Sequence, residues 1–409
     1  MAAKREKLED RLKMRRLTTD DTAQYNALLR YAFQVTDSEL AAIGWDQKDM
    51  EKSKKPVLKK TESFGFFDGD KLASQISIYP MQVNIYGRMY KMGGVTGVAT
   101  YPEYSQHGLM SRLIKEALQN MRENHQSISM LYPYFIPYYR KKGWEIVTDI
   151  MTYTIKDTQL PKRRRTEGMV ERVPIDSEDI RTVHDQFTAK RHGALKRNDL
   201  EWEEYWRWEA DDVLVAVYYN LKEEPTGYLV YYISNDVFRI KEFVYINEEA
   251  YHGLWNYISA HFSMIDKVVG NNYTNEPMAF LLEDSEIQEE IKPYMMARIV
   301  DFEAFIRKFP FDIISMYDDL HFIIEDPVME CNNGDFTLRW DAKGETIVER
   351  GGTRGRTVRC NIQTLTTMFF GYRRPSYLRR IERLEADDEA VRILEDILPI
   401  DQPYFSDYF

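Results

Sequence analysis

The sequence has little cysteine and no long apolar run, and both absences narrow the class of protein. Its 409 residues include only two cysteines, Cys331 and Cys360, which excludes a disulfide framework and favours a reducing cytoplasm. No stretch approaches the roughly 18 apolar residues that a membrane-spanning helix needs. The first residues, MAAKREKLEDRLKMRR, lack the apolar core of a signal peptide. We therefore expect a cytoplasmic protein with no membrane partner.

Metal-binding patterns are also missing. The seven histidines are scattered along the chain without the spacing of metal ligands, so no metal is expected. Neither cysteine has a motif partner nearby.

Charge is present in quantity, with an acidic balance. Charged residues make up 30% of the chain and hydrophobic residues 44%, as in a soluble globular protein. The formal net charge of −11 argues against nucleic-acid binding and mildly favours a cationic ligand. Ordinary solubility explains the same net charge more simply.

The order of helix, antiparallel strands and helix occurs twice along the chain, without obvious sequence identity between the copies. In the first copy, Thr18-Thr19-Asp20-Asp21 has the character of a capping box before an apolar helix face. Turn residues at 68–70 and 87–88 then separate strand-like runs. Residues 151–155 are expected to close this unit, and the basic run 160–165 is typical of a linker.

The second copy is expected to hold helices at 177–194 and 249–262, with strands at 213–219, 227–233 and 238–246. A third segment begins near Met296. It is expected to contain helices at 302–309, 362–370 and 390–398, with strands at 320–325, 336–340 and 346–349. Its glycine-rich run 351–356 is typical of a hairpin turn. The last five residues include three aromatics, which predicts a buried tail although chain ends are usually frayed.

A small polar loop, residues 104–108, separates the β-prone run 95–100 from an amphipathic helix that begins at Leu109. A helix N-terminus carries free backbone N–H groups and a partial positive charge, and Gly108 allows a ligand to approach closely. The loop therefore suits a phosphate-bearing ligand, although it is neither a Walker loop nor a dinucleotide fingerprint. A plain strand-to-helix turn explains it equally well.

In its context the stretch YPEYSQHGLM at 101–110 resembles motif A of the GNAT N-acetyltransferases, the loop that binds the pyrophosphate of acetyl-CoA. The usual form of that motif is Gln/Arg-x-x-Gly-x-Gly/Ala. Here Ser105 replaces the first residue and Met110 replaces the small one. The resemblance therefore keeps Gly108 and the backbone role, and it departs from the family in the side chains.

Four further features point to one GNAT family. They are Arg15-Arg16-Leu17-Thr18 together with residues 29–33, the run 95–100, the segment 138–145 (YYRKKGWE) and a C-terminal segment that ends on Phe409. Together they resemble the Eis (enhanced intracellular survival) acetyltransferases over essentially the whole chain. The resemblance also implies a homo-oligomer, a hexamer in that family.

The implied fold class is α+β, with tandem GNAT folds built on mixed, mostly antiparallel sheets. The expected domains are an acetyl-CoA-binding GNAT domain at 1–158 and a degenerate GNAT-like domain at 159–294. A sterol-carrier-protein-like α/β domain at 295–409 is expected to supply the C-terminal carboxylate.

The resemblance implies acetyl-CoA as co-substrate and assigns its contacts. The residues implied to bind it are Val98, Ala99, Thr100, Ser105, Gln106, His107, Gly108, Leu109, Met110 and Tyr134. At the matching position of the second unit stand Glu248 and Glu249, and the glycine is absent. Carboxylates at a helix start repel phosphates, so the second unit is expected to serve as scaffold and pocket wall.

Two catalytic groups follow from the family pattern. The tyrosine of Tyr-x-x-x-Gly maps to Tyr139, the implied general acid for the CoA thiolate, whose conjugate thiol has a pKa near 8.5. Tyr138 has the wrong spacing, and both tyrosines could also be core residues. The implied general base is the α-carboxylate of Phe409. Its ordinary pKa of about 3.3–3.7 would rise in apolar surroundings. A tail that only packs on its own domain is the alternative.

The expected function is acetyl transfer from acetyl-CoA to primary amines of cationic molecules, aminoglycosides among them and lysine side chains too. Because no reactive-cysteine motif exists, direct transfer in a ternary complex is expected. Asp37, Glu39 and Asp407 are candidates for holding the amine, although surface solvation explains each one individually. The rival hypothesis is a non-catalytic protein whose last domain carries a lipid or sterol. Gly108 and Tyr139 favour the enzyme.

Overall fold

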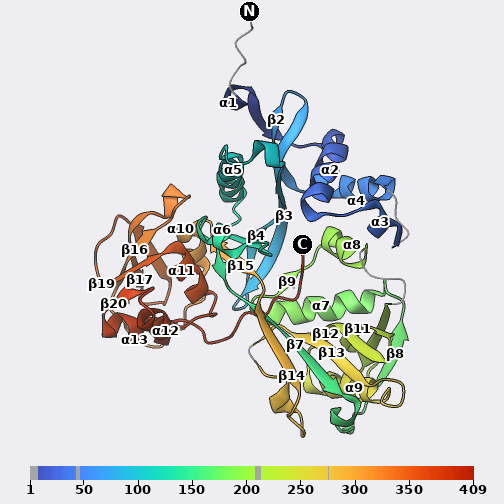
Figure 1. The fold of residues 1–409 in the computed structure, drawn as a ribbon. Coiled ribbons are helices and arrows are strands. Elements are labelled where there is room, and N and C mark those ends of the chain that lie inside the picture. Colours follow the sequence, from blue (N-terminus) through green and yellow to red (C-terminus); the bar gives the residue numbers. More distant parts are fainter. Residues whose placement is uncertain (1–7, 43–46, 208–212, 275) are drawn as a thin grey trace, which may run out of the picture.

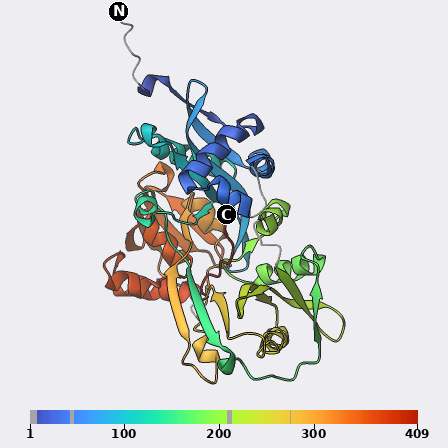
Figure 2. The same ribbon diagram turned by 45° about the vertical axis from the view of Figure 1, so that its right-hand side comes forward.

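Three β-sheets with flanking helices form three lobes in the computed structural model (Figure 1), which confirms the α+β class. The structure describes residues 8–42, 47–207, 213–274 and 276–409. Within them no helix is long and apolar enough to cross a membrane. Two views place the C-terminus in the middle of the molecule, where the lobes meet (Figures 1 and 2).

The first sheet has the order β1-β2-β3-β4-β5-β15-β6, with β9 paired to β3. The strands are β1 (Leu12–Arg16), β2 (Glu62–Asp68), β3 (Lys71–Ile85), β4 (Arg88–Thr100), β5 (Ile128–Leu131), β15 (Met296–Ile299), β6 (Glu145–Ile146) and β9 (Leu195–Lys196). Both predicted hairpins are confirmed, β2–β3 and β3–β4.

Two helices of the first lobe begin where the sequence predicts a helix start. The Thr18–Asp21 capping box is confirmed and leads through a 3-10 turn (Thr19–Asp21) into α2 (Thr22–Phe33). The predicted helix at Leu109 is α5 (Leu109–Glu123). The other helices are α1 (Leu8–Arg11), α3 (Asp37–Ala42), α4 (Gln47–Lys60), the 3-10 turn η2 (Pro102–Tyr104) and α6 (Ile136–Arg140).

The second sheet repeats the first, in the order β14-β7-β13-β12-β11-β10-β8. Its strands are β14 (Gln288–Pro293), β7 (Asp149–Lys156), β13 (Lys267–Asn272), β12 (Val237–Tyr245), β11 (Pro225–Ser234), β10 (Leu214–Tyr219) and β8 (Met169–Val173). The helices are α7 (Glu178–Lys190), α8 (Asp199–Arg207) and α9 (Glu248–Ser259), with the 3-10 turns η3 (Asp157–Gln159) and η4 (Ala279–Leu281).

The two sheets exchange one strand each. β7, which we expected to close the first unit, pairs with β13 and β14 in the second sheet. β15, which follows the whole second unit in the chain, lies between β5 and β6 of the first sheet. The expectation for residues 151–155 was therefore wrong, because an apolar strand pattern does not say which sheet the strand joins.

The third sheet, β18-β17-β16-β19-β20, forms the third lobe. Its strands are β18 (Thr346–Arg350), β17 (Gly334–Trp340), β16 (Leu320–Glu325), β19 (Arg356–Asn361) and β20 (Glu385–Ala386). The helices are α10 (Phe302–Lys308), α11 (Ile362–Phe369), α12 (Pro375–Arg380) and α13 (Asp388–Ile397), with the 3-10 turn η5 (Glu330–Asn332). Residues 351–356 are not a hairpin turn, since β19 pairs in parallel with β16 and not with β18.

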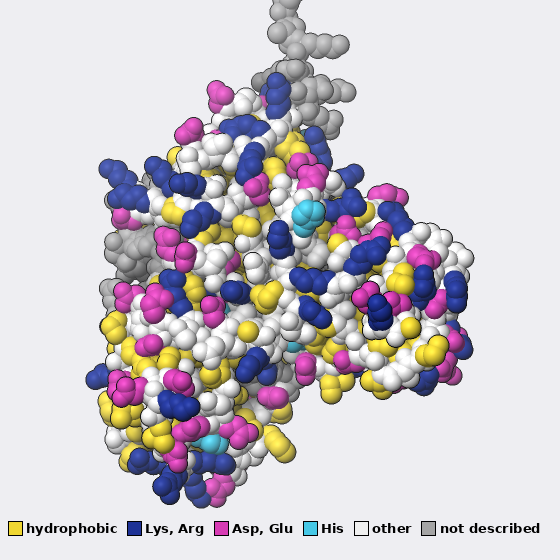
Figure 3. Space-filling view, turned by 180° about the vertical axis from the view of Figure 1, so that it is seen from behind, with side chains coloured by type: hydrophobic (Ala, Val, Ile, Leu, Met, Phe, Trp, Pro, Cys, Tyr) yellow, Lys and Arg dark blue, Asp and Glu magenta, His cyan; other side chains and the backbone are white. Residues whose placement is uncertain are grey.

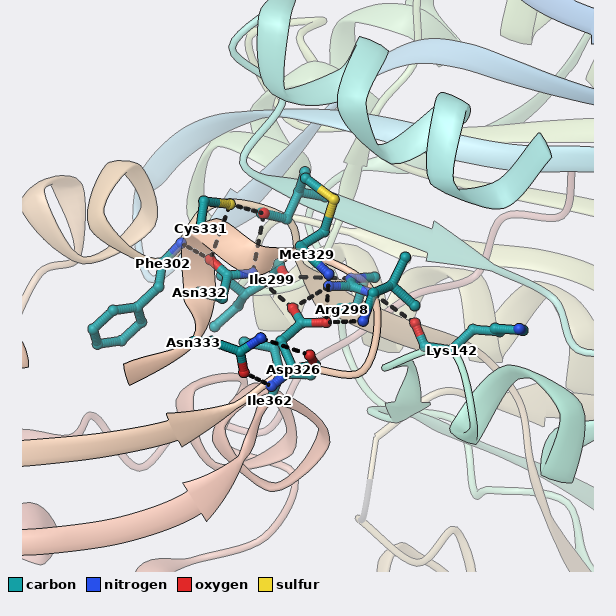
Figure 4. A network of polar contacts seen from close by, with 12 residues as sticks. Lys142, Arg298, Ile299, Phe302, Asp326, Met329, Cys331, Asn332, Asn333 and Ile362 are labelled. Carbon is teal, nitrogen blue, oxygen red and sulfur yellow. Dashed lines mark hydrogen bonds and ion pairs between the residues drawn. The ribbon is translucent and has the colours of Figure 1, made fainter. Parts of the chain in front are cut away.

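A buried ion pair ties the third lobe to the first sheet (Figure 4). Arg298 of β15 pairs with Asp326, and both side chains are fully buried. The Arg298 guanidinium also donates to the carbonyl oxygen of Lys142 at 2.5 Å, which fixes the turn after α6. Gly143 in that turn has a φ of +94°, and a Cβ there would lie 2.6 Å from Arg298 Nη1. The glycine of the Tyr-x-x-x-Gly pattern thus has a steric cause here.

Candidate active site

The first sheet opens between β4 and β5. These parallel strands pair only over Met92–Gly94 and Ile128–Met130. A bulge follows on β4, where Gly97 has a φ of +60° and the register with β3 shifts. Beyond Gly94, β4 pairs only with β3 among the described residues, so its backbone facing β5 is free. Val98, Ala99 and Thr100 lie on this open segment.

The α5 N-terminus stands at the end of that segment. Ser105, Gln106, His107 and Gly108 are all exposed. Gly108 is the N-cap with a φ of +70°, and no side chain caps the helix. The first helical bond comes from the N–H of Arg112 to Gly108, which leaves the preceding N–H groups without helical partners. A Cβ on Gly108 would meet nothing within 4 Å, so a ligand has open access.

The structure places the neighbouring candidates Leu109, Met110 and Tyr134 in different surroundings. Leu109 is buried in the apolar core and Met110 packs partly against it, so Leu109 has only its backbone to offer a ligand. Tyr134 is 82% exposed and follows the end of β5 in a surface loop.

Lys142 is a candidate that the sequence analysis missed. Its ammonium lies 2.8 Å from the hydroxyl of Ser111, in the first turn of α5. A cation there adds to the positive end of the helix. The Lys141-Lys142 pair was visible in the sequence, but only the fold brings it to α5.

Tyr139 lies in α6 with its ring buried in the core of the first lobe. The ring contacts Trp144 and Tyr138 edge to face, at 6.2 and 5.4 Å between centroids. Burial raises the pKa of Tyr139 to about 12, so the phenol keeps its proton at neutral pH. The ring also belongs to the hydrophobic core of the first lobe.

The C-terminal tail crosses from the third lobe to β4. The Tyr404 N–H donates to the His192 carbonyl oxygen, and Phe405 is fully buried. The half-buried Phe409 then packs on β4: a Cβ at Gly94 would lie 2.8 Å from its ring. Gly94 is the last residue of β4 that pairs with β5. The chain therefore ends at the mouth of the open segment.

Asp407 anchors this tail. Its carboxylate is buried and accepts from Arg197 Nε at 2.5 Å, while the same guanidinium pairs with Glu242 at 2.7 Å. Arg197 is fully buried over the rings of Trp202 and Tyr205. Asp407 is thus occupied by the protein and offers no free charge to a substrate.

The other two acidic candidates lie apart from Asp407. Asp37 is 87% exposed and pairs with Arg30. Glu39 is exposed and accepts from the Thr36 N–H at 2.8 Å, at the start of α3. Local helix-end contacts account for both residues, and the structure does not bring them together with Asp407.

A carboxylate that we did not predict, Glu201 of α8, lies beside the tail anchor. It is buried, and its Oε1 has no hydrogen-bond partner in the described part of the chain. Burial, with the nearby charge of Asp407, raises the pKa of Glu201 to about 8. The mixture of acidic and aromatic residues in EWEEYW (201–206) is the feature of the sequence that could have pointed to Glu201.

Asp407→Asn should loosen the tail without unfolding the chain. Asn keeps the shape of the side chain, and Glu242 still neutralises Arg197. We therefore expect the free energy of unfolding to fall by only about 1–2 kcal/mol. Denaturant titration measures this loss. The exposed Asp401→Asn is the matched control and should leave stability unchanged; equal effects of the two changes would contradict the anchor.

His192 makes the tail region sensitive to acid. Its Nδ1 accepts from the Tyr86 N–H, its Nε2 donates to the Phe370 carbonyl oxygen, and its ring stacks on Tyr86. Burial lowers the pKa of His192 to about 4, from 6.5.

A folded-state pKa below the unfolded value means that the unfolded chain binds the proton first. The contribution of neutral His192 to the free energy of unfolding is therefore fully present above pH 6.5 and is lost as the pH falls toward 4. Between pH 7 and pH 5 the free energy of unfolding should therefore fall by roughly 2 kcal/mol less in His192→Gln than in the unchanged protein. Denaturant titration at each pH measures this difference. The exposed His125, replaced by Asn, should leave the pH dependence intact; a similar change in both variants would refute the assignment.

Comparisons with known proteins match three parts of the chain to known domains. Residues 13–147 match the model of an acetyltransferase (GNAT) domain, residues 193–299 match a second such model, and residues 302–406 match a sterol carrier protein domain. A search of curated proteins gives no match. Among the described residues, no group of three or more His, Cys, Asp or Glu side chains could hold a metal ion.

Solved structures resemble the whole chain. A probable N-acyltransferase from Enterococcus faecalis V583 is 29% identical, with a TM-score of 0.88 over 97% of this chain and 99% of that chain. A GCN5-related N-acetyltransferase from Anabaena variabilis is 23% identical, with a TM-score of 0.84 over 98% and 100%. Eis1 from Mycobacterium abscessus is 16% identical, with a TM-score of 0.79 over 97% and 100%, and shares the fold. The chain is therefore an acyltransferase with two GNAT domains and a sterol carrier protein domain, and it shares its fold with Eis1.

Proposed function

We propose that this protein transfers acetyl from acetyl-CoA to primary amines of cationic substrates, directly within a ternary complex. The carrying observation is the position of Phe409, whose ring lies on Gly94 at the point where β4 and β5 part. That contact brings the terminal carboxylate to the lobe that carries the open strand and the uncapped helix.

The first lobe offers acetyl-CoA three kinds of contact. Free N–H groups at the start of α5 suit the diphosphate, and the Lys142 ammonium adds a charge beside them. The open backbone of Val98–Thr100 can pair with the amides of the pantetheine arm. Free N–H donors on the same segment would stabilise the oxyanion that forms during transfer.

The chemistry needs one proton acceptor and one donor. The neutral amine attacks the thioester, and as its nitrogen becomes cationic it loses a proton to the Phe409 carboxylate, so that a C–N bond forms, the C–S bond breaks and CoA leaves as the thiolate. Full proton transfer from Tyr139, with its pKa of about 12, to a thiolate whose acid has a pKa near 8.5 is uphill. Tyr139 therefore acts as a hydrogen-bond donor to the departing sulfur.

The acceptor is proposed to be a polyamine of the aminoglycoside type, with lysine side chains as a further class. Support comes from the net charge of −11. Asp407 is held by Arg197 and is therefore not proposed to hold the amine. Asp37 and Glu39 stay candidates on the exposed face of α3.

Thiol release from acetyl-CoA tests the function. The full chain is incubated with an aminoglycoside, spermidine or a lysine peptide, and thiol is followed with and without the amine. We expect amine-dependent release, with the acetylated amine identified by mass spectrometry. Absence of release with every amine, together with a lipid that co-purifies with the third domain, would replace this proposal with the lipid-carrier hypothesis.

Lys142→Ala should weaken acetyl-CoA binding. Losing a half-exposed cation beside a diphosphate is expected to cost about 1 kcal/mol, or roughly fivefold in KM for acetyl-CoA, with kcat nearly unchanged. Lys141→Ala removes the same charge one residue earlier and should change KM less. Identical effects of the two changes would mean that only the overall charge matters.

We also propose a cytoplasmic homo-oligomer, without nucleic acid or membrane, and with a hexamer as the expected size. Hydrophobic side chains gather on the lobe of the second sheet, at the lower left of Figure 3. Among the residues of the second lobe, Phe280 is 86% exposed, and Phe262 and Ile291 are also exposed. Such side chains suit contacts between subunits, and light scattering of the purified chain measures the mass.

A further inference from the structure

The second GNAT domain contains a cavity that the proposed reaction does not use. Its volume is about 370 Å³, and it lies between β12, β13, α7 and α9. Aromatic residues form much of its wall: Tyr153, Phe243, Tyr245, Tyr251, Trp255, Tyr273 and Tyr404 of the tail. Cavities of this size and lining are suited to small ligands.

The cavity exists because β12 and β13 part as β4 and β5 do. They pair in parallel only over Val237–Arg239 and Lys267–Val269. A bulge at Lys241 shifts the register of β12 against β11. Beyond Arg239, β12 pairs only with β11 in the part of the chain that the structure describes, so its other edge has no neighbouring strand and is placed to pair with an extended chain.

A side-chain hydroxyl adds to this free edge. Tyr153 is buried and lines the cavity, and a Cβ on Gly270 would lie 2.4 Å from its hydroxyl oxygen. The missing side chain at Gly270 therefore makes room for the Tyr153 ring. No described residue forms a hydrogen bond with that hydroxyl, which leaves a polar group for a ligand.

The α9 N-terminus beside the cavity is unsuited to phosphate. The Asn247 side chain caps it by accepting from the Ala250 N–H at 2.8 Å. Glu249 accepts from the Glu167 N–H and the Tyr218 hydroxyl, and Glu248 lines the cavity with an exposed carboxylate. Carboxylates at the place where α5 offers free N–H groups repel a diphosphate.

We propose that this cavity binds an extended amide chain without phosphate, such as a pantetheine arm or a short peptide. The free edge of β12 pairs with the amides of the chain, and the aromatic walls cover its methylene groups or small side chains. The binding is independent of acetyl transfer in the first domain.

The test uses the full chain in saturating CoA, which occupies the proposed first-domain site. Reduced pantetheine and the peptide acetyl-Ala-Ala-Ala-amide are titrated separately by saturation-transfer NMR. We expect at least one probe to bind in the presence of CoA. Thr274→Trp, which places a large ring in the cavity wall, should raise the Kd of that probe at least tenfold, whereas Thr274→Ser should not.

Several outcomes separate the possibilities. Pantetheine binding alone assigns the cavity to a pantetheine arm, and peptide binding alone assigns it to peptides. No binding of either probe, or binding that Thr274→Trp leaves unchanged in a variant with normal melting and CoA affinity, overturns the proposal. CoA occupying two sites per chain also overturns it. If CoA does not bind at all, the proposed function is wrong. The comparison of probe binding between the Thr274→Trp and Thr274→Ser variants would still test the cavity.

Discussion

Removal of Phe409 should lower kcat by about 10²- to 10⁴-fold, the usual contribution of a positioned base, while KM for acetyl-CoA stays within about twofold. The deletion takes away the ring that lies on Gly94 and withdraws the terminal carboxylate by one residue, roughly 3.5 Å of chain. Asp407 still pairs with Arg197, so the rest of the tail keeps its anchor. Steady-state thiol release measures both constants.

Two controls separate the charge from the ring. A semisynthetic chain with Phe409 amidated keeps the ring and removes the charge, and it should be as slow as the deletion. Phe409→Ala keeps the carboxylate and loses the ring, and it should be intermediate. An amidated enzyme with normal kcat would rule out the carboxylate as the base.

The isolated segment 1–158 should not fold, although it contains one complete family match. Its sheet would lack β15, which lies between β5 and β6. Met296, Ala297, Arg298 and Ile299 are all fully buried, and without them β5 becomes an open apolar edge. The segment also carries β7, whose partners lie in the other sheet. We expect insoluble protein, or soluble protein without a cooperative thermal transition.

Co-expression of 1–158 with 159–409 supplies the missing strand from the second fragment and is the matched control. It should give a soluble complex that melts cooperatively and binds CoA. A cooperative transition in the 1–158 segment alone would show that the strand exchange is not required for its stability.

Local sequence patterns predicted much of the first lobe. The Thr18–Asp21 capping box, the turns at 68–70 and 87–88 and the start of α5 at Leu109 depend on residues a few positions apart, and each was found where expected. α4 was missed, because its lysine-rich sequence with Pro56 inside the helix gives a weak apolar pattern and an apparent breaker.

The site was predictable in part. Motif A spacing pointed to the loop before α5. The aromatic tail predicted a buried chain end, and in the structure Phe405 is buried, Phe409 is half-buried and Tyr408 is exposed. Lys142 and Glu201 were missed, since neither is remarkable among its neighbours until α5 or the tail packs against it. Asp407 was assigned to a substrate because its partner Arg197 lies 210 positions away in the chain.

By itself the sequence determined the kinds of element and their order, because helix and strand periodicity, caps and turns are set by neighbouring residues. The tertiary structure alone decided that β7 and β15 change sheets and that Phe409 lies on Gly94. Strand partners and buried ion pairs depend on groups far apart in the chain, and they form only when folding brings those groups together and excludes water from between them.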